Sequence, residues 1–332
     1  MIGFILRRTL YMLVVLFIIS LISFTIIELP PGDYLTSYIA RLKQTGGGTV
    51  TEDQVAALRH QYGLDMPVYA RFLKWLWNAM QGDLGWSFQF NEPVSKLVGE
   101  RLGMTLVISI STVIFSYALA IPIGIYSAVK QYSLGDYLLT ILGFMGVAIP
   151  NFLLALLVMV ALFNYFGLSM GGLFSPQYAT APWSWAKFVD LLKHLPAPVL
   201  IISLSNLTWL IRIMRGTLLD ELNKPYVEAA RSRGLTEREL LFKYPARIAL
   251  NPIISTIGYV LPGVFSGATI VSIVLNLPTV GPLLFVALVS QDSYLAGSIV
   301  LILSALTVLG TLLSDILLAY IDPRIRLLEG ES

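Results

Sequence analysis

Charged residues are scarce in this sequence. Asp, Glu, Lys and Arg make up 13% of its 332 residues, whereas 56% of the residues are hydrophobic and the mean hydropathy is +0.76. This balance lies outside the range of soluble domains, so the composition predicts an integral membrane protein. The formal net charge of +2 gives no electrostatic reason to expect binding to nucleic acid.

Cysteine is absent, and His60 and His194 are the only histidines. Without cysteine the chain can form neither a disulfide nor a thiolate metal site. The two histidines are far apart and neither belongs to an H-E-x-x-H pattern, so we interpret them as polar loop residues and expect no metal site. The G-x-x-x-x-G-K-[ST] pattern is also missing, and we therefore expect neither catalytic residues nor a nucleotide cofactor in this chain.

Long uncharged runs predict six membrane-spanning helices, since about 20 apolar residues cross a bilayer. Arg7 and Arg8 precede the first run, and no small-x-small cleavage site follows it, so we interpret this run as an uncleaved helix. The predicted spans are residues 9–27, 104–129, 138–163 with a kink at Pro150, 196–219, 248–276 and 295–320. We divide the chain into a first helix (1–30), an external helical segment (31–101) and a five-helix core (102–332) with a cytoplasmic loop at about 220–247.

The distribution of basic residues predicts cytoplasmic termini. Of the 22 basic residues, 13 fall on predicted cytoplasmic segments, and seven of the other nine lie in the long segment 31–101, where the charge rule has little weight. Within that segment we expect one short helix over 51–60 and a second, amphipathic helix after Met66-Pro67. We expect this second helix to form a small cap packed on the outer membrane surface, because its apolar residues recur at helical spacing: Tyr69, Phe72, Trp75, Leu76 and Met80.

The stretch 224–252, KPYVEAARSRGLTERELLFKYPARIALNP, interrupts the apolar runs. Its charges do not suit lipid, so it is expected to lie in water or against another protein. We expect Asn223 to cap a helix that takes Pro225 in its first turn and Glu228 near the positive end of its dipole.

A glycine corner and a second helix are expected to follow. Gly234 fits the left-handed position that ends a helix. Thr236 and Glu239 have the spacing of a capping box, which predicts a helix running towards Tyr244. The stretch therefore predicts a helix, a glycine corner and a helix.

The triplet Glu228-Ala229-Ala230 followed by Gly234 resembles the EAA loop of ABC importer permeases, and YPARIALNP (244–252) is similar to its dipeptide and oligopeptide permease version. The resemblance extends to YGLDMPVYARFLKWLWNAMQGDLGWSF (62–88), NEPVSKLVGERLGMTL (91–106), the Pro-Gly-Asp at 31–33 and the Ile-Asp-Pro-Arg-Ile-Arg that begins at 321. The segment 271–281, however, lacks the Asn-Trp-Pro-Gly and nearby acidic residue often found there. This departure leaves peptide and oligosaccharide substrates open and weakens the case for a cationic one.

The resemblance implies an all-α type I ABC importer permease in a prokaryotic inner membrane. It also implies a second homologous permease, two cytoplasmic ATPases that bind ATP and Mg, and an external solute-binding protein. The helix from 225 to 233 would be the coupling helix, which moves with a groove on the ATPase. The ATPase-coupling residues implied are Tyr226, Glu228, Ala229, Ala230, Arg231, Arg233, Gly234 and Leu235.

The predicted spans carry few charges, and we expect Asp315 to lie near a cytoplasmic end. An ion-coupled secondary transporter usually needs charges at mid-membrane, so it is the less favoured alternative. A non-transporting assembly factor is the other alternative, and it would need no coupling helix. Polar residues of the spans are candidates for the translocation pathway, although small and hydroxylated residues also serve helix packing: Tyr117, Asn206, Tyr259, Ser266 and Asn276.

Overall fold

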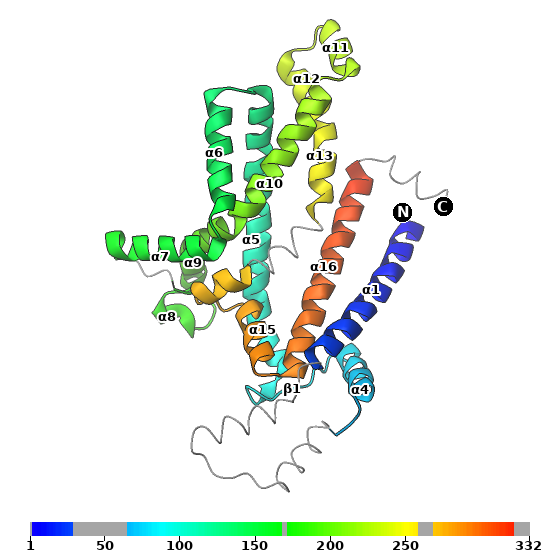
Figure 1. The fold of residues 1–332 in the computed structure, drawn as a ribbon, viewed down its shortest axis with the longest axis vertical. Coiled ribbons are helices and arrows are strands. Elements are labelled where there is room, and N and C mark those ends of the chain that lie inside the picture. The colour runs from blue at the N-terminus through cyan, green and yellow to red at the C-terminus, as the bar shows by residue number, and fades with distance from the viewer. Residues whose placement is uncertain (1, 29–64, 168–170, 258–267, 322–332) are drawn as a thin grey trace. The chain divides into compact units, whose positions relative to one another are not determined.

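The computed structural model describes residues 2–28, 65–167, 171–257 and 268–321 (Figure 1). The chain divides into two compact units. Unit 1 comprises Met1–Ile5, Leu106–Pro278 and Leu309–Ser332, and unit 2 comprises Leu6–Thr105 and Thr279–Val308. Helices α1 (Ile2–Glu28), α5 (Val94–Val129) and α16 (Ser293–Ile321) each contribute residues to both units.

The predicted helical membrane fold is confirmed. Among the described residues, four helices are long and apolar enough to cross a membrane: α1, α5, α10 (Pro196–Leu222) and α16. The bent pair α6 (Leu134–Ala148) and α7 (Asn151–Phe166) raises this number to five if it is one span. The predicted span 248–276 begins within α13 (Pro245–Ser255), but its middle, 258–267, lies outside the described residues, as does the helix expected at 51–60.

The third predicted span is not one kinked helix, because α6 and α7 meet at 100°. The break occurs at Ile149 and Pro150, which both adopt extended ψ values of 121° and 133°. Proline disfavours helical geometry in the residue before it, and its missing N–H cannot join the helical ladder. Pro150 therefore ends one helix and starts another, which is a larger effect than the kink we expected.

In unit 1, α10 is the central helix. It packs against α6, α7, α9 (Trp185–His194) and α13. The buried core between α5, α10 and α13 includes Leu210, Met214 and Leu218. A Cβ at Gly124 of α5 would lie 2.6 Å from the Cβ of Met214, so glycine is required for this close approach.

Unit 2 contains α4 (Val68–Met80), the strands β1 (Trp86–Ser87) and β2 (Glu92–Pro93), and α15 (Val280–Val289). The strands form one antiparallel pair with Trp86 opposite Pro93, a small departure from the all-α expectation. One core joins the start of α5 to α15 and α16, and a second core joins α1 to α4 through Phe24, Phe72 and Trp75. The amphipathic helix expected after Met66-Pro67 is thus present, although Tyr69 and Met80 are exposed rather than packed.

Candidate functional site: the helical corner at residues 224–247

The helical corner, residues 224–247, begins where α10 ends (Figure 1). Helix α11 (Pro225–Ser232) has Pro225 in its first turn and Glu228 near its N-terminus, as expected. The predicted cap is wrong, because Lys224 rather than Asn223 is the N-cap residue and it makes no side-chain capping bond. The Asn223 amide nitrogen instead donates to the Leu219 carbonyl at 3.0 Å, so this side chain satisfies the end of the preceding helix.

Gly234 ends α11 in the left-handed conformation, with φ at +81°. Its N–H donates to the Arg231 carbonyl at 3.0 Å, which closes the last turn. Nothing lies within 4 Å of a Cβ built at this position. Glycine is therefore favoured here by backbone conformation and not by crowding within the chain.

The predicted capping box starts α12 (Glu237–Lys243). The Thr236 hydroxyl accepts from the Glu239 N–H at 3.4 Å, and the Glu239 carboxylate accepts from the Thr236 N–H at 3.3 Å. At Tyr244 the chain turns directly into α13, whose first residue is Pro245. The corner is thus a continuous series of three short helices with defined boundaries.

A small internal core holds α11 against α12. Val227 and Leu240 have no exposed surface and Ala230 is 7% exposed, while Tyr226, Leu235 and Tyr244 pack around them. The Tyr226 hydroxyl also donates to the Glu221 carboxylate at 2.6 Å, which joins the corner to α10. Three of the predicted coupling residues, Tyr226, Ala230 and Leu235, therefore face the inside of the corner.

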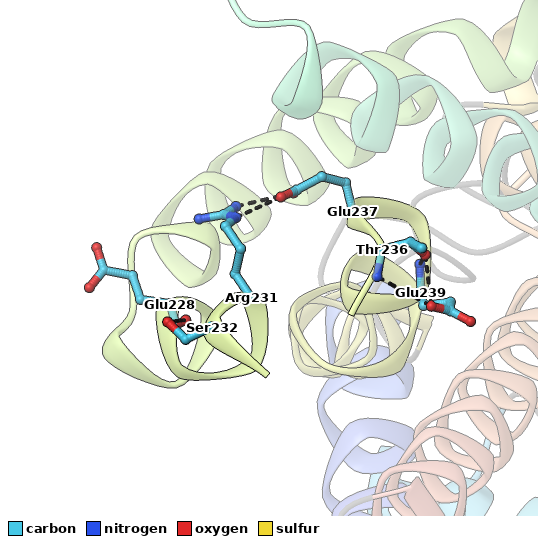
Figure 2. Close-up of polar contacts among 6 residues, drawn as sticks. All are labelled: Glu228, Arg231, Ser232, Thr236, Glu237 and Glu239. Carbon is cyan, nitrogen blue, oxygen red and sulfur yellow. Dashed lines mark hydrogen bonds and ion pairs between the residues drawn. The ribbon is translucent and has the colours of Figure 1, made fainter. Parts of the chain in front are cut away.

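The other five predicted coupling residues lie on the surface of the corner: Glu228, Ala229, Arg231, Arg233 and Gly234. Arg233 and Gly234 directly follow the last residue of α11, and we call the five residues together the exposed face of α11. The Arg231 guanidinium donates two hydrogen bonds to Glu237, at 2.6 and 3.1 Å, across the turn between the helices. Figure 2 shows these two side chains pointing towards each other while the Glu228 carboxylate points away from the pair. Glu228 is thus oriented towards the surroundings of the corner.

The polar contacts of the corner shift several pKa values. The hydrogen bond from Arg231 lowers the pKa of the Glu237 carboxyl, and the contacts with Thr236 lower that of Glu239. Burial raises the pKa of the Tyr226 phenol, and the hydrogen bond to Glu221 adds to this rise. At neutral pH the phenol remains protonated as the donor, and the two carboxylates remain charged.

The corner is connected to the apolar helices at both ends. At its start, α11 follows α10 after two residues, and the Tyr226–Glu221 bond spans that junction. At its end, α12 and α13 contact each other, and α13 packs along α10. The Thr217 hydroxyl of α10 also donates to the Ala249 carbonyl of α13 at 3.3 Å. Helix α11 is therefore linked to two packed helices, α10 and α13.

The candidate pathway residues have different environments. The Tyr117 hydroxyl of α5 shares a hydrogen bond with the Thr256 hydroxyl at 2.8 Å, and Asn206 is half-buried on α10. Asn276 is exposed with φ at +50°, so it occupies the left-handed position after a helix, which asparagine tolerates better than most residues. Tyr259 and Ser266 lie outside the described residues.

Sequence reasoning missed the polar contacts of three carboxylates: Asp292, Glu28 and Asp136. Asp292 lies at the start of α16 with no exposed surface, where its carboxylate accepts from the Ser87 hydroxyl at 2.6 Å, the Gln89 N–H at 3.0 Å and the Leu295 N–H at 3.2 Å. Two ion pairs were also missed, Arg71–Glu28 at 2.7 Å and Arg215–Asp136 at 2.9 Å. Each contact joins residues more than 40 positions apart, apart from Asp292 to Leu295, so no local spacing indicates it. In the described part of the chain, no group of three or more metal-ligating side chains comes together.

Comparison with known proteins gives matches along nearly the whole chain. Residues 120–327 match the family described as binding-protein-dependent transport system inner membrane component, and residues 1–110 match the N-terminal family of such membrane components. The oligopeptide transport system permease protein AppB of Bacillus subtilis is 34% identical, covering 98% of this chain and 99% of the relative. A putative peptide permease of Brucella ovis is 33% identical with the same coverage. The peptidoglycan transport system permease protein YejB of Agrobacterium fabrum is 29% identical, over 97% and 98% of the two chains.

Proposed function

Because this chain belongs to the family of inner membrane components of binding-protein-dependent transport systems, we propose that it forms half of the transmembrane pathway of an importer for short peptides. Relatives named for oligopeptide, peptide and peptidoglycan transport support a small oligomeric solute. Oligosaccharides are the second candidate, since the segment 271–281 departs from the familiar peptide pattern.

The partners follow from this role. A second, homologous permease completes the pathway, two cytoplasmic ATPases supply energy with ATP and Mg, and an external binding protein delivers the solute. This chain itself hydrolyses no ATP and holds no cofactor. The termini and the helical corner face the cytoplasm, and the segment 31–101 faces the outside, in agreement with the distribution of basic residues in the short loops.

The observation that carries the proposal is the exposed face of α11. The inner residues of α11 pack in the corner's own core, whereas Glu228 and Ala229 are exposed on this helix of only eight residues and Arg233 is exposed directly after its end. Small residues there allow close approach by another backbone, and the charges can pair with those of a partner. Closure of the ATPase dimer moves α11, and α10 and α13 transmit the motion, so that nucleotide shifts a two-state equilibrium between inward-facing and outward-facing pathways.

The test is reconstitution of the complete complex in vesicles. We expect ATP hydrolysis to rise when the loaded binding protein is added, and peptide uptake to require ATP and to persist without an ion gradient. Uptake that follows a proton or sodium gradient without ATP would establish the secondary transporter instead. A complex that transports no solute would favour the assembly factor.

The identity of the solute and the orientation of the chain in the membrane are tested separately. Mass spectrometry of the ligand in the co-purified binding protein should find a short peptide or an oligosaccharide, and a free metal ion or a lipid would refute the substrate class. For orientation, a single cysteine at Ser232 should react with an impermeant maleimide only after the membrane is opened. Labelling of that cysteine in intact cells would refute the cytoplasmic position of the corner.

A further inference from the structure

Helix α4 presents three faces with different chemistry. Phe72 and Trp75 are 3% and 2% exposed and form the face that packs against α1. A second face carries polar residues, with Arg71 half-buried and Lys74 exposed. The third face is apolar and exposed. It consists of Tyr69, Leu73, Trp77 and Met80, which are 71%, 58%, 62% and 68% exposed.

The spacing of the third face makes it one continuous stripe. Its members follow one another by four, four and three residues, which places them along one side of a helix. Soluble proteins seldom expose four large apolar side chains side by side to water. The residues of α4 that pack in the core of unit 2 are Phe72 and Trp75. The stripe is therefore not part of the packing within unit 2.

The position of α4 indicates what covers the stripe. The candidate span of α1 ends at Glu28, and the Glu28 carboxylate pairs with Arg71 of α4 at 2.7 Å. One turn before that end, the Phe24 ring stacks on Trp75 at 5.6 Å and lies 5.4 Å from the Phe72 ring. Helix α4 is therefore fixed at the level where a membrane helix leaves the bilayer.

The surface of α1 near this junction is also apolar and exposed. Only 11% of its candidate span is buried, and Ile22 and Ile26 are 52% and 57% exposed. Tryptophan and tyrosine are the residues enriched at the boundary between hydrocarbon and headgroups, because their rings are apolar and carry one polar group. The stripe on α4 contains one of each.

We infer that α4 lies in the plane of the membrane interface, with the stripe Tyr69, Leu73, Trp77 and Met80 inserted among the phospholipid acyl chains near their headgroups. The lipid contact fixes the height of α4. Through the contact of Trp75 with Ser298 (indole N–H to hydroxyl, 3.3 Å), it also fixes the position of the β1–β2 hairpin, because Ser298 donates to the Leu84 carbonyl at 3.1 Å. This inference requires only that α1 spans the membrane and is independent of the solute.

The natural absence of cysteine permits a direct test. Single cysteines at Leu73, Trp77, Lys74 and Ile26 of the full chain would carry a nitroxide label. The chain would be reconstituted in vesicles of phosphatidylethanolamine and phosphatidylglycerol, and collisions with oxygen and with a water-soluble nickel chelate would be measured by electron paramagnetic resonance. All four positions are exposed, so the labels disturb no packed core.

We expect labels at Leu73 and Trp77 to collide several-fold more with oxygen than with the chelate, as the label at Ile26 does on α1. The label at Lys74, on the polar face of the same helix, should show the reverse preference. Access of the chelate to Leu73 and Trp77 equal to that at Lys74 would show that the stripe lies in water. Shielding from both reagents would show that protein covers it. Either result overturns the inference.

Discussion

The helical corner (residues 224–247) and the hairpin cap (residues 65–93) both contain charged residues and both adjoin long apolar helices, yet their charged side chains differ in burial. The hairpin cap is held by Asp292, which is fully buried beneath the hairpin, and by the pair of Arg71 with Glu28, whose side chains are only 12% and 11% exposed. In the helical corner, the Arg231 and Glu237 side chains are 51% and 70% exposed. The cap is thus held by contacts that a partner cannot reach, whereas the corner leaves its charged groups available for contact.

This difference matters because burial decides what a polar contact contributes. Removing one partner of a buried contact leaves the others without hydrogen bonds in a medium that cannot replace them. An exposed ion pair contributes little to stability, since water competes for its hydrogen bonds and salt screens its charges. Substitutions in the cap should therefore affect structure, and substitutions on the exposed face of α11 should affect function at normal abundance.

The largest effect is expected for Asp292→Ala. The substitution leaves the donors of Ser87, Gln89 and Leu295 unsatisfied, at a cost of about 1–3 kcal/mol for each buried group. Hydrogen exchange in the β1–β2 hairpin should accelerate strongly. Asp190→Ala, which removes another buried carboxylate from unit 1, is the control and should leave the hairpin protected. An unchanged hairpin in Asp292→Ala would show that the cap is held by its apolar core alone.

Valine substitutions at two glycines distinguish the effect of backbone strain from an effect on transport. Gly234 and Gly82 have φ values of +81° and +88°, and neither has an atom within 4 Å of a built Cβ. Valine at either position should cost about 1–2 kcal/mol locally, and both variants should insert normally. Only Gly234→Val should lose peptide uptake and couple ATP hydrolysis poorly, because under the proposed function its side chain would intrude where the ATPase approaches. Equal uptake by the two variants at equal membrane abundance would argue against a special role for the corner.

Charge reversal at Arg231 distinguishes an internal brace from a partner contact. We expect Arg231→Glu to leave membrane abundance unchanged, because the pair with Glu237 is exposed, and to reduce uptake. The double variant Arg231→Glu, Glu237→Arg restores the internal pair but keeps the charge of the exposed face altered. It should therefore remain impaired in uptake assays. Full recovery would mean that the ion pair shapes the corner and that Arg231 meets no partner.

The smallest effect concerns pH, and its sign differs between the two regions. Burial raises the pKa of Asp292, so the folded state favours the protonated carboxyl, and the stability gained from that protonation is present at low pH and is lost as pH rises through the raised value. The Arg231 contact lowers the pKa of Glu237, so its contribution is present above the ordinary glutamate range and is lost as pH falls through the lowered value. Protection of each region, corrected for intrinsic exchange rates, should show these opposite trends. Asp292→Asn and Glu237→Gln should each abolish one trend; retention of both would refute the assignment.

Local signals predicted much of the corner. The Thr236–Glu239 spacing, Pro225 in a first turn and Gly234 at a helix end all act within a few residues, and the structure has each of them. Asn223 was assigned wrongly because the same side chain can satisfy the end of one helix or the start of the next. The angle between α6 and α7 at Pro150 could not be predicted either, because it depends on how these two helices pack against α10.

Long-range polar contacts could not be predicted. Ser87 and Asp292 are 205 positions apart, and nothing near either residue indicates the other. The sequence motif also did not show which residues of α11 face inwards and which face outwards, because Ala229 and Ala230 are adjacent residues of the same type. Only the packing of Ala230 against the core with Val227 and Leu240 distinguishes them. The motif therefore locates the corner, and the fold decides which of its residues face outwards.

That distinction gives the most direct measurement of the central claim, that the exposed face of α11 contacts the ATPase. Single cysteines at Ala229 and Ala230 differ by one position, one exposed and one 7% exposed. In the chain without ATPases, maleimide should label the cysteine at Ala229 rapidly and the one at Ala230 slowly. In the assembled, active complex, labelling at Ala229 should be blocked. Rapid labelling of the Ala229 cysteine in a complex that still couples ATP hydrolysis to uptake would contradict the account.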